Sequence, residues 1–100
     1  MTQTWQRLKK EPQYLSNLLI REKVVEAIRQ FFKTRNYHEV EVPLLSSGLI
    51  PESYLEVFET TLLDRHRKPQ PAFLTPSPEL FLKKLLVSGF GSCFSLSKSF

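Results

Sequence analysis

The sequence predicts an α+β fold, and three patterns along the chain support this class. Apolar residues at intervals of three and four indicate a long amphipathic helix over residues 18–35. Alternating apolar and polar residues indicate strands at 38–42 and 94–100. Between these strands, Ser77-Pro78-Glu79 has the composition of a helix start. Together the patterns predict helices and strands combined in one mixed domain.

The composition limits the class of protein. Of the 100 residues, 41% are hydrophobic and 24% are charged, which suits a single small globular domain. The net charge of +4 permits a polyanionic partner without requiring one. Cys93 is the only cysteine, so an internal disulfide and a cysteine metal cluster are excluded, and Cys93 is expected to pack in the interior. No apolar run approaches the roughly 20 residues that span a bilayer, and no signal-peptide pattern is seen. We therefore expect a soluble, cytoplasmic protein with no membrane partner.

Residues 1–16 are predicted to form a lead-in, because they contain Pro12 and sustain no period. They are expected to be too short for a separate folded domain. The helix that follows is expected to be capped by Ser16 or Asn17 and to end at Asn36, which tolerates a left-handed conformation. Its apolar stripe consists of Leu18, Ile20, Val24, Val25, Ile28, Phe31 and Phe32, and its polar side of Arg21, Glu22, Glu26, Arg29, Gln30 and Lys33.

The strand predicted at residues 38–42 ends at Pro43, which has no N–H to donate to a sheet ladder. Its alternation places Glu39 and Glu41 toward solvent or a partner chain, so we do not interpret them as a pair of catalytic carboxylates. His38 is interpreted as a turn residue or a surface imidazole rather than a catalytic base.

A hairpin is predicted in the middle of the chain. Residues 44–56 are expected to form a loop, and strands are expected at 57–63 and 72–75. The charged, proline-containing residues 64–71 would connect the two strands. This connection carries the basic residues Arg65, His66, Arg67 and Lys68. We interpret them as a solvated hairpin tip rather than a nucleic-acid patch, because no aromatic side chain is interleaved with them. The sequence contains no phosphate-binding loop and no dinucleotide-binding glycine pattern.

The last quarter of the chain is predicted to contain a helix and a strand. Ser77 is a suitable N-cap, Pro78 fits the first helical position, and Glu79 places a carboxylate in the first turn. Gly89 is the expected helix stop. In the final strand, Phe94, Leu96 and Phe100 alternate with serines. Because the chain ends within this pattern, we expect the native protein to continue beyond Phe100. The helix is expected to present Leu80, Phe81, Lys84, Leu85 and Val87 at helical spacing.

Three of these segments resemble the class II aminoacyl-tRNA synthetases. The helix over 18–35 with Val40-Glu41-Val42-Pro43 resembles their motif 1, and Phe94 to Phe100 resembles the first strand of their motif 2. Residues 74–91 resemble the substrate-binding helix of the lysyl, aspartyl and asparaginyl subgroup. Within it, the chain is most similar to the stand-alone lysyl-tRNA synthetase paralogues that attach lysine to elongation factor P, since about sixteen residues precede motif 1. Pro76, inserted before Ser77, departs from the commoner motif and could displace the rim of the pocket.

The resemblance implies a class II synthetase-like antiparallel sheet flanked by helices, of which residues 17–100 would be an incomplete, N-terminal part. It implies a two-step ligation in which lysine is activated with ATP and Mg²⁺ and then transferred to elongation factor P. Ser77, Pro78 and Glu79 would bind the amino acid, with Glu79 pairing with its ammonium group. The chain would contain no catalytic residue and no metal ligand, because most ligands of ATP and Mg²⁺ would lie beyond residue 100. Alone, the chain would be inactive.

The resemblance also implies a homodimer, with an interface that includes Val24, Ile28, Phe31, Val42 and Pro43. Two alternatives remain open. The chain could be part of a lysyl-tRNA synthetase, with tRNA as the acceptor, or a non-catalytic dimerisation or binding module derived from the same fold. No DNA partner is expected. Both acceptors are anionic, so the net charge does not distinguish the two ligases.

Overall fold

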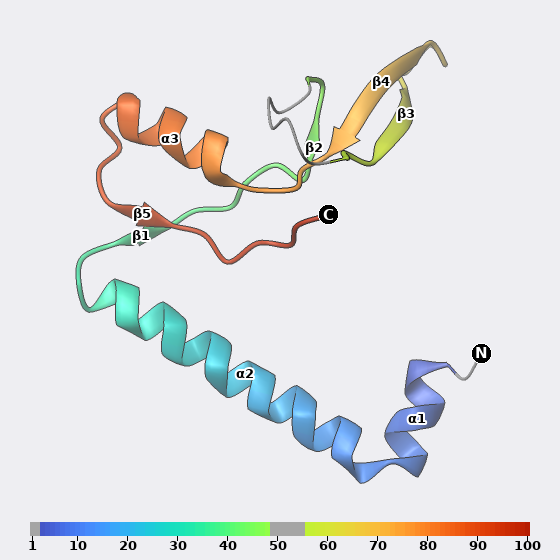
Figure 1. Cartoon of the computed structure of the whole chain (residues 1–100), viewed down its shortest axis with the longest axis vertical. Coiled ribbons are helices and arrows are strands. Elements are labelled where there is room, and N and C mark those ends of the chain that lie inside the picture. Colours follow the sequence, from blue (N-terminus) through green and yellow to red (C-terminus); the bar gives the residue numbers. More distant parts are fainter. Residues whose placement is uncertain (1–2, 49–55) are drawn as a thin grey trace. The chain divides into compact units, whose positions relative to one another are not determined.

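The computed structural model describes residues 3–48 and 56–100, and the chain divides into two compact units that are considered separately (Figure 1). The first unit extends to Asn36 and the second begins at Tyr37. Helices and small sheets both occur, so the mixed α and β composition predicted from the sequence is confirmed. Most of the predicted loop at 44–56 lies outside the described residues.

The first unit consists of two helices, α1 (Thr4–Lys10) and α2 (Pro12–Lys33). Residues 4–16, which were predicted as part of a lead-in without a sustained period, are helical except for Glu11, and Ser16 and Asn17 lie inside α2 rather than at its cap. Pro12 occupies the first turn of α2, where its missing N–H costs nothing, so it starts a helix instead of breaking one. Arg7 links α1 to the start of α2. Its guanidinium stacks on the Tyr14 ring at 4.1 Å and lies 3.7 Å from the Glu11 carboxylate.

The end of α2 agrees with the sequence. Asn36 has a φ of 64°, the left-handed conformation predicted for it. The preceding turn is closed by a hydrogen bond of 3.1 Å from the Asn36 N–H to the Lys33 carbonyl oxygen. Arg35 then folds back over Phe31, with its guanidinium 3.7 Å from the ring centroid and a hydrogen bond to the Phe31 carbonyl oxygen.

The second unit contains a three-stranded antiparallel sheet in the order β2 (Leu45–Ser46), β4 (Pro69–Leu74), β3 (Glu59–Leu63). The predicted hairpin is confirmed, but its tip is shorter than expected and both prolines of the predicted connection belong to β4. Pro71 pairs with Thr61 and Pro69 with Leu63, while the Leu74 N–H donates to Phe58. In an antiparallel ladder every second residue directs its N–H away from the neighbouring strand, and Pro69 and Pro71 occupy such positions with respect to β3. On the other side of β4, strand β2 pairs only with Phe73 and Leu74. The prolines therefore cost no ladder hydrogen bond.

A separate parallel pair joins β1 (His38–Glu39) to β5 (Cys93–Phe94). Val40 and Val42 are half-buried and Glu41 is exposed, which is the alternation predicted for this strand. The final strand is much shorter than predicted, because residues 95–100 pair with no strand in the described part of the chain. Of its predicted inward residues, Phe94 is 5% exposed, whereas Leu96 and Phe100 are 38% and 43% exposed.

Helix α3 (Glu79–Val87) connects the two sheets (Figure 1). It stops where predicted, with Gly89 at a φ of 88°. The N–H of Phe90 reaches the carbonyl oxygen of Leu85, and the N–H of Gly89 reaches that of Leu86, both at 3.1 Å. This pair of hydrogen bonds requires a left-handed backbone conformation at position 89, which glycine adopts without steric cost.

The interior formed by the described residues is small. Ala72 and Phe94 are the buried hydrophobic side chains, and Thr75 is the buried polar one. Cys93, predicted to be packed, is half-buried. Many large apolar side chains of both helices and strands remain exposed, including Leu19 at 52% and Phe58 at 63%.

Candidate functional site

A pocket of about 310 Å³ lies at the start of α3 in the second unit. Its walls come from the segment after β1, from β2, from the residue that follows β4, and from the first turns of α3. These elements are far apart in sequence, so the pocket depends on the tertiary fold. The lining residues are Pro43, Leu45, Ser46, Ser47, Thr75, Ser77, Pro78, Leu80, Phe81 and Lys84.

Thr75 holds two of the walls together. Its N–H donates to the Leu44 carbonyl oxygen at 2.9 Å, and its hydroxyl donates to the Pro43 carbonyl oxygen at 3.3 Å. Its own carbonyl oxygen accepts a hydrogen bond of 3.2 Å from the Phe100 N–H. Thr75 is only 9% exposed, so these bonds are sheltered from water and fix the segment before α3 against the segment after β1.

Replacing Thr75 with valine is expected to destabilise the protein by about 1–2 kcal/mol, because the Pro43 carbonyl loses its hydroxyl donor in a sheltered place while the side-chain shape is kept. The free energy of unfolding, from denaturant titration of the intact protein, measures the change. Thr61→Val on exposed strand β3 is the matched control and should change the stability by no more than about 0.5 kcal/mol. Equal stability of the two variants would contradict the role of Thr75.

Ser77 and Pro78 shape the rim of the pocket where α3 begins. The Ser77 hydroxyl oxygen accepts a hydrogen bond of 3.2 Å from the Glu79 N–H, and the Pro78 carbonyl oxygen accepts one of 3.1 Å from the Leu82 N–H. The hydrogen bond expected of Ser77 is therefore present, although α3 begins one residue later than predicted, with Pro78 rather than Ser77 at the N-cap position. Both residues are half-buried and line the pocket. The positive end of the helix dipole lies at this rim, which favours negative or hydrogen-bond-accepting groups there.

Glu79 lies beside the pocket but does not line it. Its carboxylate pairs with the Lys83 ammonium at 2.7 Å, one turn further along α3, and the two side chains are 60% and 65% exposed. The hydrogen bond from Lys83 and its positive charge hold the pKa of Glu79 below its usual range, and the same contact raises the pKa of Lys83. The structure therefore brings Ser77 and Pro78 into the pocket and directs the third predicted residue to solvent.

Replacing Lys83 with glutamine is expected to raise the pKa of Glu79 toward its ordinary value, since both causes of the lowering are removed. A carboxyl with a depressed pKa in the folded state stabilises the fold above its unfolded pKa, and this contribution is lost as the pH falls through the folded pKa. An NMR titration of the Glu79 side-chain carbon, with and without the substitution, measures the shift. An identical midpoint in both proteins would contradict the pairing.

Sequence reasoning missed several lining residues. Lys84 is the one ionisable side chain among the lining residues, and the sequence indicated it only as a member of a helical face. Its spacing of seven from Ser77, two helical turns, could have placed both on one side of α3. Leu45 and Ser46 could not be found from pattern, because β2 is two residues long and has no period of its own.

The predicted interface residues are divided between the two units. Val24, Ile28 and Phe31 lie on the apolar face of α2, with exposures of 52%, 36% and 51%. With Ala27 and Phe32 they line a shallow hollow of about 390 Å³. Val42 and Pro43 belong to the second unit, where Val42 is half-buried and Pro43 lines the pocket at α3.

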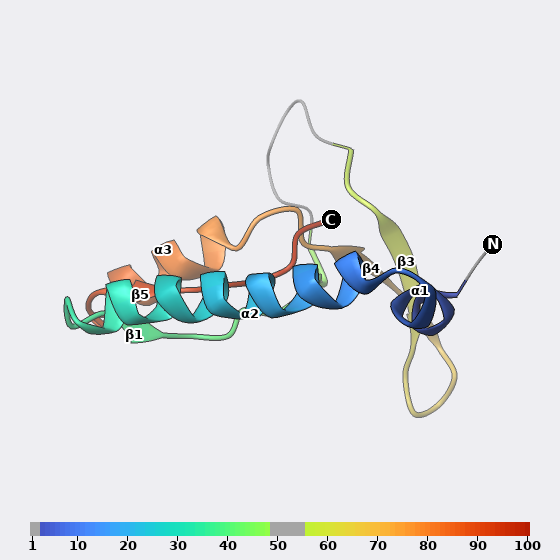
Figure 2. The same ribbon diagram turned by 90° about the horizontal axis from the view of Figure 1, so that it is seen from below.

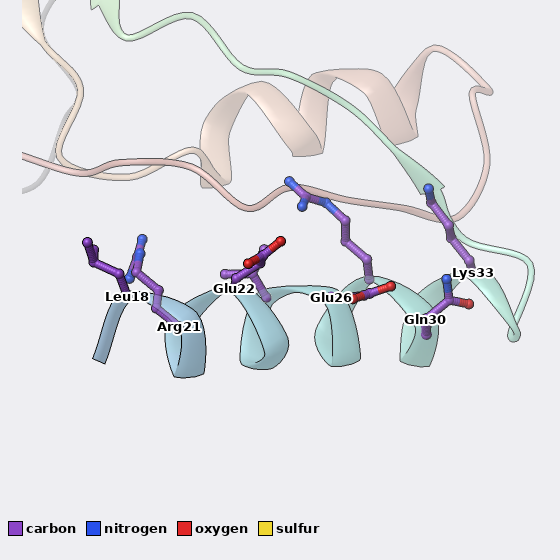
Figure 3. Close-up of a pocket in the computed structure, with 8 residues that line it drawn as sticks. Leu18, Arg21, Glu22, Glu26, Gln30 and Lys33 are labelled. Carbon is purple, nitrogen blue, oxygen red and sulfur yellow. The ribbon is translucent and has the colours of Figure 1, made fainter. Parts of the chain in front are cut away.

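The polar side of α2 is a helix surface rather than an enclosed site. Figure 3 shows Arg21, Glu22, Glu26, Gln30 and Lys33 projecting along this side. They line a hollow, and every residue of its lining comes from α2. The predicted charged residues lie together on this side, but Leu18 and Val25, which were predicted for the apolar stripe, line the same hollow. The described part of the chain contains no group of three or more His, Cys, Asp or Glu side chains able to hold a metal ion. Among the same residues, none of the helices has the length and apolar character needed to cross a membrane.

The chain belongs to the family described as tRNA synthetases class II (D, K and N), which it matches over residues 1–100. The resemblance seen in the sequence is thereby confirmed, and the family implies the class II fold for this mixed structure. More particularly, the chain is similar to proteins named elongation factor P–(R)-beta-lysine ligase.

Three of these relatives show the extent of the match. The ligase of Baumannia cicadellinicola is 39% identical over an aligned length of 89 positions, and the match covers 86% of this chain and 27% of the relative. That of Haemophilus influenzae is 39% identical over 87 residues, with the same shares of the two chains. That of Salmonella arizonae is 37% identical over an aligned length of 100 positions, and the match covers 99% of this chain and 30% of the relative. The chain thus spans less than a third of the length of these relatives.

Proposed function

We propose that this chain is part of a ligase that activates lysine, or its isomer β-lysine, with ATP and transfers it to elongation factor P. The observation that supports this most strongly is the similarity to ligases named for that acceptor, at 37% to 39% identity over 86% to 99% of the chain. The short share of each relative that is covered supports assigning the remaining steps to further parts of the intact protein. We place that protein in the cytoplasm, as a homodimer that contacts its partner through α2.

In this proposal the pocket at α3 receives the amino acid. Ser77 and Pro78 already line it, and Glu79 lies in the adjoining first turn. To pair with a substrate ammonium, the Glu79 carboxylate exchanges one ammonium group, that of Lys83, for another. This exchange costs little, because the Glu79–Lys83 pair is exposed to solvent, which screens the attraction between the two charges. Binding at Glu79 would orient the amino acid so that its carboxylate can attack the α-phosphorus of ATP.

We assign ATP and Mg²⁺ to parts of the protein outside this chain. The described residues do not fit a Mg²⁺ site, since no cluster of acidic side chains is present, so no step is derived through the metal here. Lys84 is the one cation in the pocket wall, and one cation is too little to neutralise a triphosphate. We therefore expect the 100-residue chain alone to be inactive in adenylation.

Amino-acid-dependent exchange of pyrophosphate into ATP by the intact protein tests the first step. Exchange that requires lysine or β-lysine, and is absent with aspartate or asparagine, is the expected result. Exchange that responds to aspartate or asparagine instead would contradict the proposal, and so would the absence of any exchange. A tRNA ligase is the second candidate, favoured by the family description, and it differs only in the acceptor.

A further inference from the structure

The tip of the β3–β4 hairpin has a defined backbone geometry. It projects at the end of the hairpin that is remote from β2 (Figures 1 and 2). The Asp64 N–H donates to the Lys68 carbonyl oxygen at 3.1 Å, and the Arg67 N–H donates to the Asp64 carbonyl oxygen at 2.9 Å. Arg67 has a φ of 58°. This is a three-residue hairpin loop, Arg65 to Arg67, that closes on a left-handed residue.

The acidic side chain of the tip, Asp64, accepts hydrogen bonds from backbone N–H groups. One Asp64 carboxylate oxygen accepts the N–H of His66 at 2.7 Å and that of Lys68 at 2.9 Å. Within the described residues, Arg65, Arg67 and Lys68 have no ion pair, and all three are exposed. Asp64 therefore fixes the shape of the loop without pairing with its cations. Three permanent positive charges therefore lie together on a hydrogen-bonded hairpin tip.

The left-handed conformation of Arg67 is a further reason to infer that the positive charge of the tip has a function. Glycine or asparagine usually closes a loop of this type, because an ordinary side chain is strained at positive φ. Here the position carries arginine. The sequence thus keeps a third cation at the tip where a neutral residue would suit the backbone better.

We propose that the basic tip, residues 65–68, docks on an acidic surface of the protein that accepts the activated amino acid. This inference rests on the proposed function, in which the acceptor is elongation factor P. A protein fits better than RNA for two reasons. No phenylalanine, tyrosine or tryptophan lies between Glu59 and Ala72 to stack on bases, and Leu63, 65% exposed, adds an apolar contact beside the charges. Such a tip speeds and orients the encounter of the two proteins.

The test compares binding of elongation factor P to the intact protein and to a triple variant, Arg65→Gln, Arg67→Gly and Lys68→Gln. Glycine suits the left-handed position, so the hairpin should remain folded, which circular dichroism checks. The dissociation constant at low salt is expected to rise about tenfold, and its salt dependence to become shallower. Pyrophosphate exchange, which needs no acceptor, should be unchanged.

Two control variants keep the test specific. Arg65→Lys with Arg67→Lys retains every charge and should bind as the wild type does. Lys9→Gln with Lys10→Gln removes two exposed cations from α1 and should change the dissociation constant less than twofold. Unfractionated tRNA is the second probe, and its binding to the triple variant should be unaffected.

The outcomes separate the inference from the proposed function. Weaker binding of elongation factor P alone supports the docking role. Unchanged binding of elongation factor P overturns it, and so does a loss of tRNA binding, whether alone or equal to that of elongation factor P. If wild-type protein shows no pyrophosphate exchange, the proposed function fails. If exchange is intact and binding of elongation factor P is unchanged by the triple variant, only the docking role fails.

Discussion

Replacing Phe31 with aspartate is expected to convert the proposed homodimer into monomers. Phe31 lines the apolar hollow on α2 with half its surface exposed, and Arg35 covers one face of its ring. The substitution removes an aromatic contact and places a charged carboxylate on the apolar face, which has to be desolvated when the dimer forms even though Arg35 lies nearby. The expected cost is on the order of 3–5 kcal/mol of dimer stability, or roughly two to four decades in Kd. Sedimentation equilibrium of the intact protein measures the change.

Gln30→Asp is the matched control for Phe31→Asp. It adds the same charge one residue earlier, near the same helix end, but on the polar side of α2. We expect that variant to remain dimeric. A dimer that survives Phe31→Asp with an unchanged Kd would show that the apolar face of α2 is not the interface.

Replacing Glu79 with glutamine is expected to lower kcat/KM for the amino acid in pyrophosphate exchange by roughly fivefold, the size of effect expected when an ion pair at an exposed carboxylate is lost. The substitution removes the charge that would hold the substrate ammonium while keeping the shape of the side chain. It also leaves the hydrogen bond from its N–H to Ser77 in place, so the start of α3 should be preserved. Steady-state kinetics with varied amino acid and saturating ATP measure the effect.

Two further variants show whether the loss comes from substrate binding. Glu59→Gln makes the same chemical change on exposed strand β3, away from the pocket, and should leave kcat/KM within about twofold. Lys83→Gln releases the Glu79 carboxylate from its partner and should not weaken amino-acid binding. If Glu79→Gln has the kinetics of the wild type, Glu79 serves only to pair with Lys83 and to stabilise the helix dipole.

The parts of the fold that could be predicted are those determined by local chemistry. The stripe of α2, its left-handed end at Asn36, the hairpin, and the glycine stop after α3 all follow from periodicity or from a single backbone requirement. The early start of α2 was missed because Pro12 is both a helix starter and a helix breaker, and only the neighbouring α1 decides between the two. The two-residue strand β2 exists only through its pairing with β4, which a local pattern does not contain, and the strand predicted over 94–100 pairs with β1 only at its start.

In the candidate site too, residues whose role follows from local chemistry could be predicted, and residues whose role follows from tertiary contacts could not. Ser77 and Pro78 were found because a helix start has a recognisable composition. Thr75 and Lys84 were not singled out, since their roles arise from the approach of residues 43–46 to α3. Glu79 was predicted as a ligand, but the nearest cation one turn along the helix holds its carboxylate in the structure.

Transfer of labelled amino acid to a purified acceptor tests the central proposal most directly. The intact protein would be incubated with ATP, Mg²⁺ and labelled lysine or β-lysine, with either elongation factor P or unfractionated tRNA as acceptor. We predict stable labelling of elongation factor P, dependent on ATP, and no labelling of tRNA. Labelling of tRNA without elongation factor P would contradict the account and assign the chain to a tRNA synthetase. Labelling of neither, under conditions in which a known ligase of this type is active, would contradict a ligase role altogether.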